Sequence, residues 1–143
     1  MGKILANGML KKLGLKVTVP RITILRILTT MKARHLSAED IYRKISEQGY
    51  DIGLATVYRV LTKFESAGLV IRHNFEGDHS MFELDKGEHH DHIVCIKCGN
   101  VEEFVDMVIE ERQMAIAKQC DFLVTDHALY IYGTCHNCNS TTN

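Results

Sequence analysis

The spacing of apolar residues predicts a helical N-terminal half. Residues 4–13 are weakly helical and end at Gly14, and residues 21–32 carry apolar side chains at every third or fourth position, the spacing of one helix face. Ser37-Ala38-Glu39-Asp40 is a capping box that should begin a third helix, which ends at Gly49. A fourth helix is expected from Gly53 until Gly68 stops it, with a buried stripe of Val57, Val60, Leu61 and Phe64.

Strands are expected after the helices. Residues 69–73 and 80–84 would form a hairpin joined by residues 74–79, and helices followed by such a hairpin are typical of a winged helix-turn-helix domain. After residue 85 the pattern predicts strands at 92–96, 101–105 and 122–133, with a helix at 107–119 that Asp106 would cap. The residues after Cys138 are polar and are expected to be frayed.

Charge divides the chain at the same place. Residues 1–85 carry 13 Lys and Arg against 9 Asp and Glu, a net charge of +4, whereas residues 86–143 carry 4 against 9, a net charge of −5. The first 34 residues contain 8 basic residues and no acidic residue. This basic region favours contact with nucleic acid, although a basic stretch can equally be an ordinary solvated surface.

Several classes of protein are disfavoured. The hydrophobic content of 45% argues against a disordered chain, and no apolar run approaches the roughly 18 residues of a membrane span. The N-terminus has lysines but no apolar signal segment, so we expect a cytoplasmic protein without a membrane partner. Because the common nucleotide-binding, nucleophile-elbow and zinc-protease motifs do not occur, we expect no enzyme activity.

Four of the five cysteines form two pairs. Cys95-x-x-Cys98 and Cys135-x-x-Cys138 are separated by 36 residues. Four thiolates spaced in this way suit a closed tetrahedral zinc site, and the alternatives are disulfides or a redox pair. Since no secretory signal indicates an oxidising compartment, structural zinc is the preferred interpretation. Cys120 is left over and is expected to be a small buried side chain.

The second part of the chain is too short to bury a large core. A domain of about fifty residues usually depends on a metal, a disulfide or a partner chain. We therefore expect an α+β protein with a winged helix-turn-helix domain at residues 1–85 and a small αβ dimerisation domain, stapled by zinc, at residues 86–143.

A run of metal-binding side chains precedes the first cysteine pair. His89-His90-Asp91-His92 leads into Ile93 and Val94, which favour a strand. Because successive side chains of a strand point to opposite faces, His90 and His92 should share one face and His89 and Asp91 the other. One short strand would then supply ligands to two separate metal sites.

The fourth predicted helix also has a distinctive outer face. Six residues lie outside its buried stripe and none of them is acidic: Ala55, Thr56, Tyr58, Arg59, Thr62 and Lys63. Such a face suits a recognition helix in the major groove, where arginine binds guanine and small or aromatic groups contact the thymine methyl. The alternative is an ordinary solvated helix face.

Together these segments closely resemble the ferric uptake regulator family of metal-dependent repressors, over nearly the whole chain. The matching segments are residues 14–21, 37–40, 53–61, 73–77, 82–84 and 89–92, together with both cysteine pairs. The resemblance implies a homodimer, or a tetramer of two dimers, that binds an operator in double-stranded DNA through an N-terminal winged helix.

The resemblance also implies three sets of metal ligands. Cys95, Cys98, Cys135 and Cys138 would hold structural zinc. A regulatory site would consist of His35, Glu83, His90, His92 and Glu103, and an additional site of His89, Asp91, Glu110 and His127. Residue spacing alone does not distinguish Glu103 from Glu102 or Glu110 from Glu111, and His35 by itself is typical of a loop histidine. His73, His79 and His136 match no ligand position and are expected on the surface or in the wing.

The resemblance assigns the DNA contacts and the metal as well. Tyr58 and Arg59 would contact bases, with Thr56 on the same helix face, Lys16 would enter a minor groove, and Arg21 and Arg72 would contact phosphates. Glutamates at 83 and 103 favour the iron-sensing branch, since the peroxide-sensing branch tends to have aspartate there and the zinc-sensing branch usually adds a cysteine. Nitrogen and oxygen ligands accept Fe²⁺ and, as substitutes, Mn²⁺, Co²⁺ or Zn²⁺.

The sequence therefore predicts an iron-responsive repressor of iron-uptake genes. A metal that joins the two halves of the chain would lock the dimer in its operator-binding conformation. The alternatives are a peroxide- or zinc-sensing member of the same family, a metalloenzyme with an open His/carboxylate site, or a zinc-stapled interaction module without DNA affinity.

Overall fold

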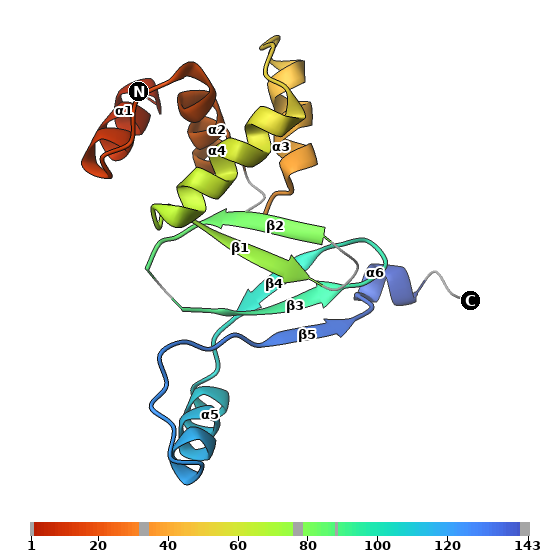
Figure 1. Ribbon diagram of the computed structural model, residues 1–143. Coiled ribbons are helices and arrows are strands. Elements are labelled where there is room, and N and C mark those ends of the chain that lie inside the picture. The colour runs from red at the N-terminus through yellow and green to blue at the C-terminus, as the bar shows by residue number, and fades with distance from the viewer. Residues whose placement is uncertain (1, 32–34, 76–78, 88, 141–143) are drawn as a thin grey trace. The chain divides into compact units, whose positions relative to one another are not determined.

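Four helices follow one another in the first part of the chain (Figure 1). The structure is a computed structural model that describes residues 2–31, 35–75, 79–87 and 89–140. They are α1 (Gly2–Lys12), α2 (Val19–Thr30), α3 (Ala38–Glu47) and α4 (Leu54–Ser66). The side chain of Thr18 caps α2, and α3 begins with the predicted capping box, in which Ser37 and Asp40 exchange hydrogen bonds. The predicted end of the second helix at Lys32 lies outside the described residues.

A hairpin of β1 (Val70–Phe75) and β2 (His79–Leu84) follows the helices. Gly68, with a φ of +76°, makes the turn between α4 and β1, a backbone conformation that glycine adopts without strain. The strands pair antiparallel from Val70 opposite Leu84 to Phe75 opposite His79, while residues 76–78 of the predicted turn lie outside the described residues. Helices followed by this hairpin confirm the predicted winged-helix arrangement.

A further pairing on the other side of β2 was not predicted. Leu36 and Phe82 exchange two backbone hydrogen bonds, with N···O distances of 2.9 and 2.7 Å, and form an isolated antiparallel bridge. The centre of β2 is therefore held between β1 and the segment just before α3. This pairing brings His35, the neighbour of Leu36, close to Glu83, the neighbour of Phe82.

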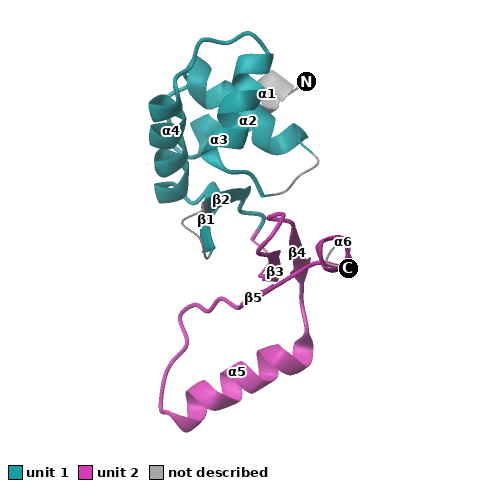
Figure 2. Ribbon diagram, turned by 90° about the vertical axis from the view of Figure 1, so that its right-hand side faces the viewer, with its two compact units in different colours: residues 1–86 teal, residues 87–143 magenta. Residues whose placement is uncertain are grey.

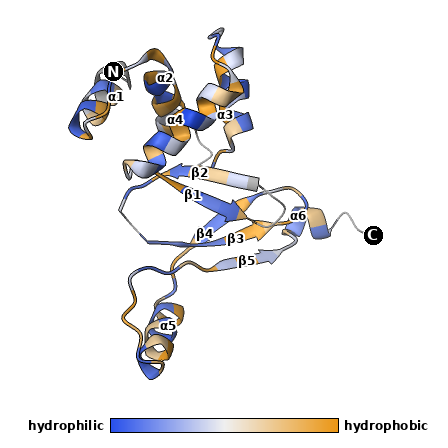
Figure 3. Cartoon of the chain, in the orientation of Figure 1, coloured by the Kyte–Doolittle hydropathy of each residue, from blue (hydrophilic) through white to orange (hydrophobic). Residues whose placement is uncertain are grey.

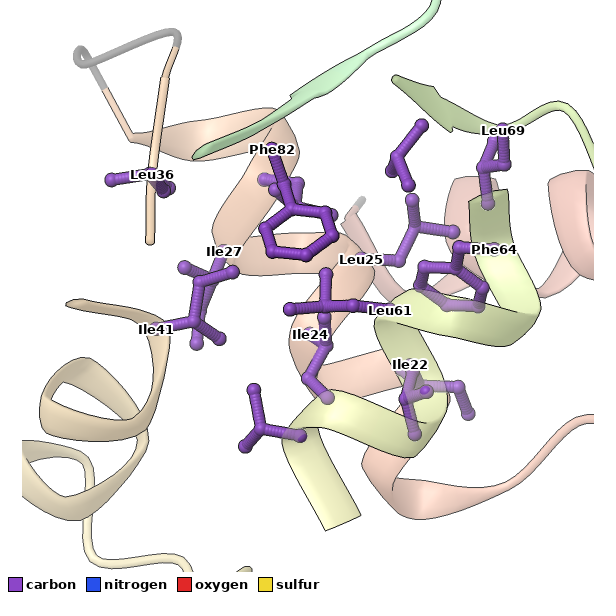
Figure 4. Packing of buried hydrophobic residues seen from close by; sticks show 14 of the residues in the cluster. Ile22, Ile24, Leu25, Ile27, Leu36, Ile41, Leu61, Phe64, Leu69 and Phe82 are labelled. Carbon is purple, nitrogen blue, oxygen red and sulfur yellow. The ribbon is translucent and has the colours of Figure 1, made fainter. Parts of the chain in front are cut away.

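The hydrophobic core of this part lies among α2, α3, α4 and the hairpin (Figure 4). Leu61 and Phe64 of α4 and Phe82 of β2 are completely buried, and the whole predicted stripe of α4 faces this core. Each fully buried leucine or phenylalanine contributes roughly 1.5–3 kcal/mol to folding. The core fixes α4 and the hairpin and leaves the opposite face of α4 exposed to solvent.

The second part of the chain is a small sheet with two helices. It comprises β3 (Asp91–Cys95), β4 (Val101–Phe104), α5 (Met107–Gln119), β5 (Tyr130–Gly133) and α6 (His136–Asn139). The strand order is β4-β3-β5, with β4 antiparallel and β5 parallel to β3. As predicted, Asp106 caps α5, and its carboxylate accepts hydrogen bonds from two backbone N–H groups of the first turn.

Two predictions for this part are wrong in extent. The strand predicted at 122–133 exists only as β5. Its pairing with β3 begins with Tyr130 opposite His92, and the residues before β5 belong to no strand among the described residues. The chain after Cys138 was expected to be frayed, but α6 continues to Asn139. Residues 141–143 of that tail lie outside the described residues.

The chain separates into two compact units, Met1–Lys86 (unit 1) and Gly87–Asn143 (unit 2), shown in two colours in Figure 2. Among the described residues of unit 2, the only buried hydrophobic side chains are Val94 and Cys95, and α5 buries none of its residues. Figure 3 shows hydrophobic as well as hydrophilic positions along α5. Unit 2 therefore has almost no hydrophobic core of its own. The helices in the described part of the chain are all too short or too polar to span a membrane.

Candidate metal centres and DNA-binding face

The four paired cysteines form one group in unit 2, which we call the cysteine cluster (Cys95, Cys98, Cys135 and Cys138). Their sulfur atoms all lie within 4.8 Å of one another, and no cysteine of the chain forms a disulfide. Cys95 ends β3, and Gly99, with a φ of +77°, turns the chain directly after Cys98. Cys135 is the N-cap of α6, and its backbone N–H donates to Sγ of Cys95 at 3.3 Å.

The thiols of this cluster affect one another's ionisation. Backbone hydrogen bonds, first from Cys135 and then from Cys98, lower the pKa of Cys95 to about 6, so that its thiolate is present at neutral pH. Hydrogen bonds with Cys135 and Cys98 raise the pKa of Cys138 to about 12. Four thiolates cannot gather at this spacing without a counter-charge, and a divalent cation with a preference for sulfur supplies it. The donor set therefore fits a metal ion.

A second group, the His89 cluster (His89, Asp91, Glu110 and His127), also lies within unit 2. The ligand atoms of His89, Glu110 and His127 all lie within 4.8 Å of one another, and Asp91 is outside that set but contacts His89. Nε2 of His89 lies 3.1 Å from Oε1 of Glu110, and Nε2 of His127 lies 2.9 Å from the other oxygen, Oε2. The rings of His89 and His127 are 4.2 Å apart between centroids. The structure distinguishes the two glutamates of α5, because Glu110 contacts both histidines whereas Glu111 is exposed.

Asp91 gives this cluster the character of a cation site. Its side chain is completely buried, and neither carboxylate oxygen has a hydrogen bond within the described residues, although Nε2 of His89 lies 3.3 Å from Oδ1. Burying an ionised carboxylate without hydrogen bonds carries a desolvation penalty on the order of several kcal/mol. A bound cation offsets that penalty. The orphaned oxygens of Asp91 therefore fit a metal ion in the His89 cluster.

In unit 1 a single carboxylate lies between two histidines. Glu83 is only 2% exposed, and its Oε2 lies 3.2 Å from Nε2 of His35. Its other oxygen, Oε1, lies 2.6 Å from Nε2 of His73. His35, which looked like an ordinary loop histidine in the sequence, is placed here by the Leu36–Phe82 bridge.

The other members of the predicted regulatory set lie together in unit 2. His92 of β3 and Glu103 of β4 are direct cross-strand partners, and Nε2 of His90 lies 3.5 Å from Oε1 of Glu103. The rings of His90 and His92 are 4.9 Å apart. Glu102 pairs with Ile93 instead, and its exposed carboxylate accepts a hydrogen bond from Asn100. Strand alternation thus separates two glutamates that the sequence leaves equivalent.

The outer face of α4 carries the predicted base-contacting residues. Tyr58 and Arg59 are exposed, and Thr56, which is half-buried, accepts a hydrogen bond from the Arg59 guanidinium at 3.1 Å. The hydroxyl of Tyr58 donates to Oε1 of Glu39 on α3 at 2.7 Å, and this hydrogen bond raises the pKa of the phenol. An acidic group therefore lies beside the predicted base-contacting residues, because α3 places the carboxylate of Glu39 against Tyr58.

The three other basic residues differ in how they are held. Lys16 is exposed, and its backbone carbonyl accepts a hydrogen bond from Arg21 at 2.9 Å. Arg72 donates to Thr62 at 3.1 Å, lies 3.5 Å from a Glu65 oxygen and stacks over the ring of Phe82, 5.0 Å from its centre. Glu65 would therefore compete with a phosphate for the guanidinium of Arg72, whereas Lys16 carries its charge at an exposed position.

The burial of two single residues differs from the sequence analysis. His73 was expected on the surface or in the wing; it lies in the wing hairpin, on β1, but it is 6% exposed and contacts Glu83. Strand alternation was the missed signal, because β1 turns His73 to the same side as the buried Phe75. Cys120 was expected to be buried, but it follows α5 and is exposed, since α5 has no buried face for it to join.

Known proteins of one family match this sequence and structure over most of the chain. The sequence model of the ferric uptake regulator family matches residues 12–132. A ferric uptake regulation protein of Legionella pneumophila is 64% identical over 129 residues, which are 90% of this chain and 95% of that protein. The structure of the ferric uptake regulator from Pseudomonas aeruginosa with manganese is 51% identical, with a TM-score of 0.77, over 92% of this chain and 98% of the other. The Francisella tularensis regulator with iron is 44% identical, with a TM-score of 0.84, over 88% and 96%.

Proposed function

Because the chain belongs to the ferric uptake regulator family, we propose that it is an iron-responsive repressor of iron-uptake genes. Members of this family are metal-dependent transcription regulators that bind DNA and typically form dimers, and they are not enzymes. Within the family, the proposal concerns which metal this chain senses, which residues bind it, and how binding reaches the DNA.

The regulatory ion would be held by ligands from both units. Unit 1 would supply His35 and Glu83, and unit 2 would supply His90, His92 and Glu103. When bound, the ion supplies positive charge that compensates the buried Glu83 and the half-buried Glu103, and it links the two ligand groups. What supports the proposal is that each group is already gathered within its own unit, at 3.2 Å between His35 and Glu83 and 3.5 Å between His90 and Glu103.

The chemistry of the proposed ligands favours iron sensing over the peroxide and zinc sensing of other family members. Two carboxylates and three imidazoles suit Fe²⁺ and Mn²⁺, whereas neither the aspartates of a peroxide sensor nor the extra cysteine of a zinc sensor stands at these positions. The related structures from Francisella tularensis and Pseudomonas aeruginosa contain iron and manganese, respectively. Since zinc binds such ligands more tightly than iron does, the response to iron would follow from metal availability in the cell.

The cysteine cluster would hold structural zinc, and the His89 cluster would hold a further divalent ion. Four sulfur donors without a carboxylate or histidine suit zinc in a closed site. The His89 cluster has nitrogen and oxygen donors, as in the regulatory site, and includes the orphaned carboxylate of Asp91. Only the regulatory site would draw ligands from both units, so only it would respond as the switch.

Unit 2 would be the dimerisation unit. The most exposed of its large apolar side chains lie mainly around α5, at its two ends and directly after it, including Val105, Met107, Val108, Ile116, Phe122 and Leu123. Leu123 is 91% exposed and Phe122 is 74% exposed. A second copy of this unit would cover them and replace the hydrophobic core that one copy lacks. The two α4 helices of the dimer would then enter successive major grooves, about 34 Å apart.

The energetics of such a switch are within reach of one metal site per chain. Moving a population from 1:99 to 99:1 requires about 5.5 kcal/mol of differential binding. A site with micromolar affinity supplies about 8 kcal/mol in total. Most of the metal-binding free energy must therefore be specific to the conformation in which the ion binds both ligand groups. Ligands drawn from two units would provide this dependence.

The proposal is tested by removing the regulatory metal while retaining the zinc. A weak chelator is applied, elemental analysis verifies one zinc per chain, and DNA binding is then measured before and after adding Fe²⁺ without oxygen, Mn²⁺, Co²⁺ or Zn²⁺. The probes are a duplex selected for binding from a random-sequence pool and an unselected duplex. We expect the stripped protein to bind the selected duplex about 100-fold more weakly, in proportion to the competent population. Equal binding with and without the added metal would contradict the proposal.

Tyr58 provides a separate test of the DNA-binding face. Replacing Tyr58 by alanine should weaken binding to the selected duplex by roughly 10–100-fold, the effect of losing one base-reading contact, and change binding to random duplex much less. Tyr42→Ala is the matched control, because Tyr42 lies on α3 with 39% exposure against 38% for Tyr58. Fluorescence anisotropy at one fixed salt concentration measures both affinities. An equal loss on both duplexes would exclude a base-reading role for Tyr58.

A further inference from the structure

One buried histidine of unit 1 belongs to none of the proposed ligand sets. His73 is 6% exposed, and its Nε2 lies 2.6 Å from Oε1 of Glu83. This short contact lies inside the hairpin that supplies Glu83 to the proposed regulatory site. A carboxylate that binds a metal ion is ionised and only accepts hydrogen bonds, so in a metal-bound site Nε2 of His73 would be the donor.

The backbone explains why these two side chains meet. Glu83 is directly opposite Ile71, and His73 is two residues further along β1, so His73 and Glu83 are diagonal neighbours on one face of the hairpin. The ring of His73 stacks on that of Phe75, with centroids 5.6 Å apart and planes 4° from parallel. The stack fixes the plane of the imidazole and therefore the direction of its Nε2–H.

The two oxygens of Glu83 consequently have different surroundings. Oε1 faces His73 on the β1 side, whereas Oε2 lies 3.2 Å from Nε2 of His35, which the Leu36–Phe82 bridge holds on the opposite side of β2. A carboxylate that accepts a strong hydrogen bond at one oxygen is restrained in rotation about its terminal bond. Only its second oxygen is then directed toward His35.

We propose that His73 is a positioning residue for the regulatory metal site. Its hydrogen bond holds Oε1 of Glu83, so that Glu83 binds the ion through Oε2 alone. The inference rests on the proposed function, since it takes Glu83 as a metal ligand. Hydrogen bonds to a ligating carboxylate orient it and tune its affinity for the metal. His73 therefore sets both the strength of binding by Glu83 and the number of oxygens that Glu83 contributes.

Two substitutions separate this role from simple packing. His73→Phe keeps an aromatic ring beside Phe75 but has no donor, whereas His73→Gln loses the ring and keeps an N–H group near the position of Nε2. His73→Asn is also polar but is too short to reach Oε1 of Glu83. The pair Gln and Asn keeps the test decisive if the Phe variant does not fold, and thermal unfolding of each zinc-loaded variant without added metal identifies such a failure.

The measurement is a Co²⁺ titration of the full-length, zinc-loaded protein. Co²⁺ is followed by its visible absorption, whose band positions and intensity depend on the number and geometry of its ligands. The part of the spectrum that Glu83→Ala removes defines the signal of the regulatory site and separates it from Co²⁺ in the His89 cluster. The readout is metal affinity together with the spectrum, and DNA binding is not needed.

We expect His73→Phe and His73→Asn to weaken this Co²⁺ binding by about 10–100-fold and to change its spectrum, as the loss of a hydrogen bond to a ligand does. His73→Gln should restore the affinity and the spectrum toward those of the parent. Parental binding by the Phe and Asn variants would overturn the inference, and so would equal weakening in all three variants, because that result would mean a packing role. If Glu83→Ala leaves the Co²⁺ spectrum unchanged, the regulatory site itself is wrongly assigned, a different failure from the other two.

Discussion

Replacing His90 by alanine is expected to abolish metal-stimulated binding to the selected duplex while leaving the zinc content and the dimer unchanged. His90 lies 3.5 Å from Glu103 and stands immediately before β3, so its loss removes one nitrogen donor from the unit 2 half of the regulatory set. Loss of a direct ligand should cost at least the roughly 10–100-fold in metal affinity that loss of an outer hydrogen bond costs. At micromolar metal the variant should therefore behave like stripped protein.

The chain offers a matched pair of controls for this prediction. Glu103→Ala should resemble His90→Ala, because Glu103 faces His90 and is the cross-strand partner of His92. Glu102→Ala should bind DNA like the parent, because Glu102 is exposed and lies opposite Ile93. Zinc analysis and sedimentation accompany each binding titration. Full affinity of His90→Ala in the presence of Fe²⁺ or Mn²⁺ would show that His90 is not a regulatory ligand.

Cys95→Ser should have the largest effect on the integrity of the protein. The described part of unit 2 buries only Val94 and Cys95 among its hydrophobic residues, so the cysteine cluster and a partner chain must provide most of its stability. In small zinc domains the metal contributes about 10–16 kcal/mol of apparent binding free energy, far more than Val94 can. We expect the variant to lose its zinc and to sediment as a monomer.

Cys120→Ser is the matched control for the cysteine cluster. Cys120 lies in the same unit, but it is exposed and belongs to none of the metal-binding groups. Its replacement should leave one zinc per chain and an intact dimer. Unit 1 should keep its helices in both variants, since its core is complete without unit 2, and circular dichroism tests this. Unchanged zinc content and unchanged sedimentation of Cys95→Ser would refute the assigned role of the cluster.

The parts of the fold that local sequence determines were predictable. The stripe of Val57, Val60, Leu61 and Phe64 follows from the helical period alone, and all four residues are buried. The caps at Ser37 and Asp106 could be predicted because each depends on hydrogen bonds to residues within the next turn. These features could be predicted because the residues that determine them lie within a single helix or its first turn, and contacts with the rest of the chain changed little.

Contacts that depend on strand pairing could not be predicted in the same way. The meeting of His35 with Glu83 depends on the bridge between Leu36 and Phe82, which joins segments more than forty residues apart and has no local signature. The difference between Glu102 and Glu103 becomes visible only when the register with β3 is known. The proposed ligand sets could therefore be named from resemblance, but why His35 lies beside Glu83 and His92 beside Glu103 became visible only with the strand pairing.

Apolar alternation misled the prediction after α5. Residues such as Leu123 and Leu129 alternate with polar residues as in a half-buried strand, yet Leu123 is 91% exposed. An alternating pattern indicates a face that will be covered, but it does not say whether the cover is a neighbouring strand or another chain. In this region the pattern is better explained by the proposed partner subunit than by the sheet.

The wide separation of the two cysteine pairs also has a consequence for synthesis on the ribosome. The core of unit 1 is complete by residue 86, and domains generally fold as units as they are made. The proposed zinc site of unit 2 is incomplete until Cys135 and Cys138 have emerged, about forty residues after Cys95. A nascent chain is therefore expected to carry a folded winged helix for several seconds before it is able to capture zinc or associate with a second polypeptide.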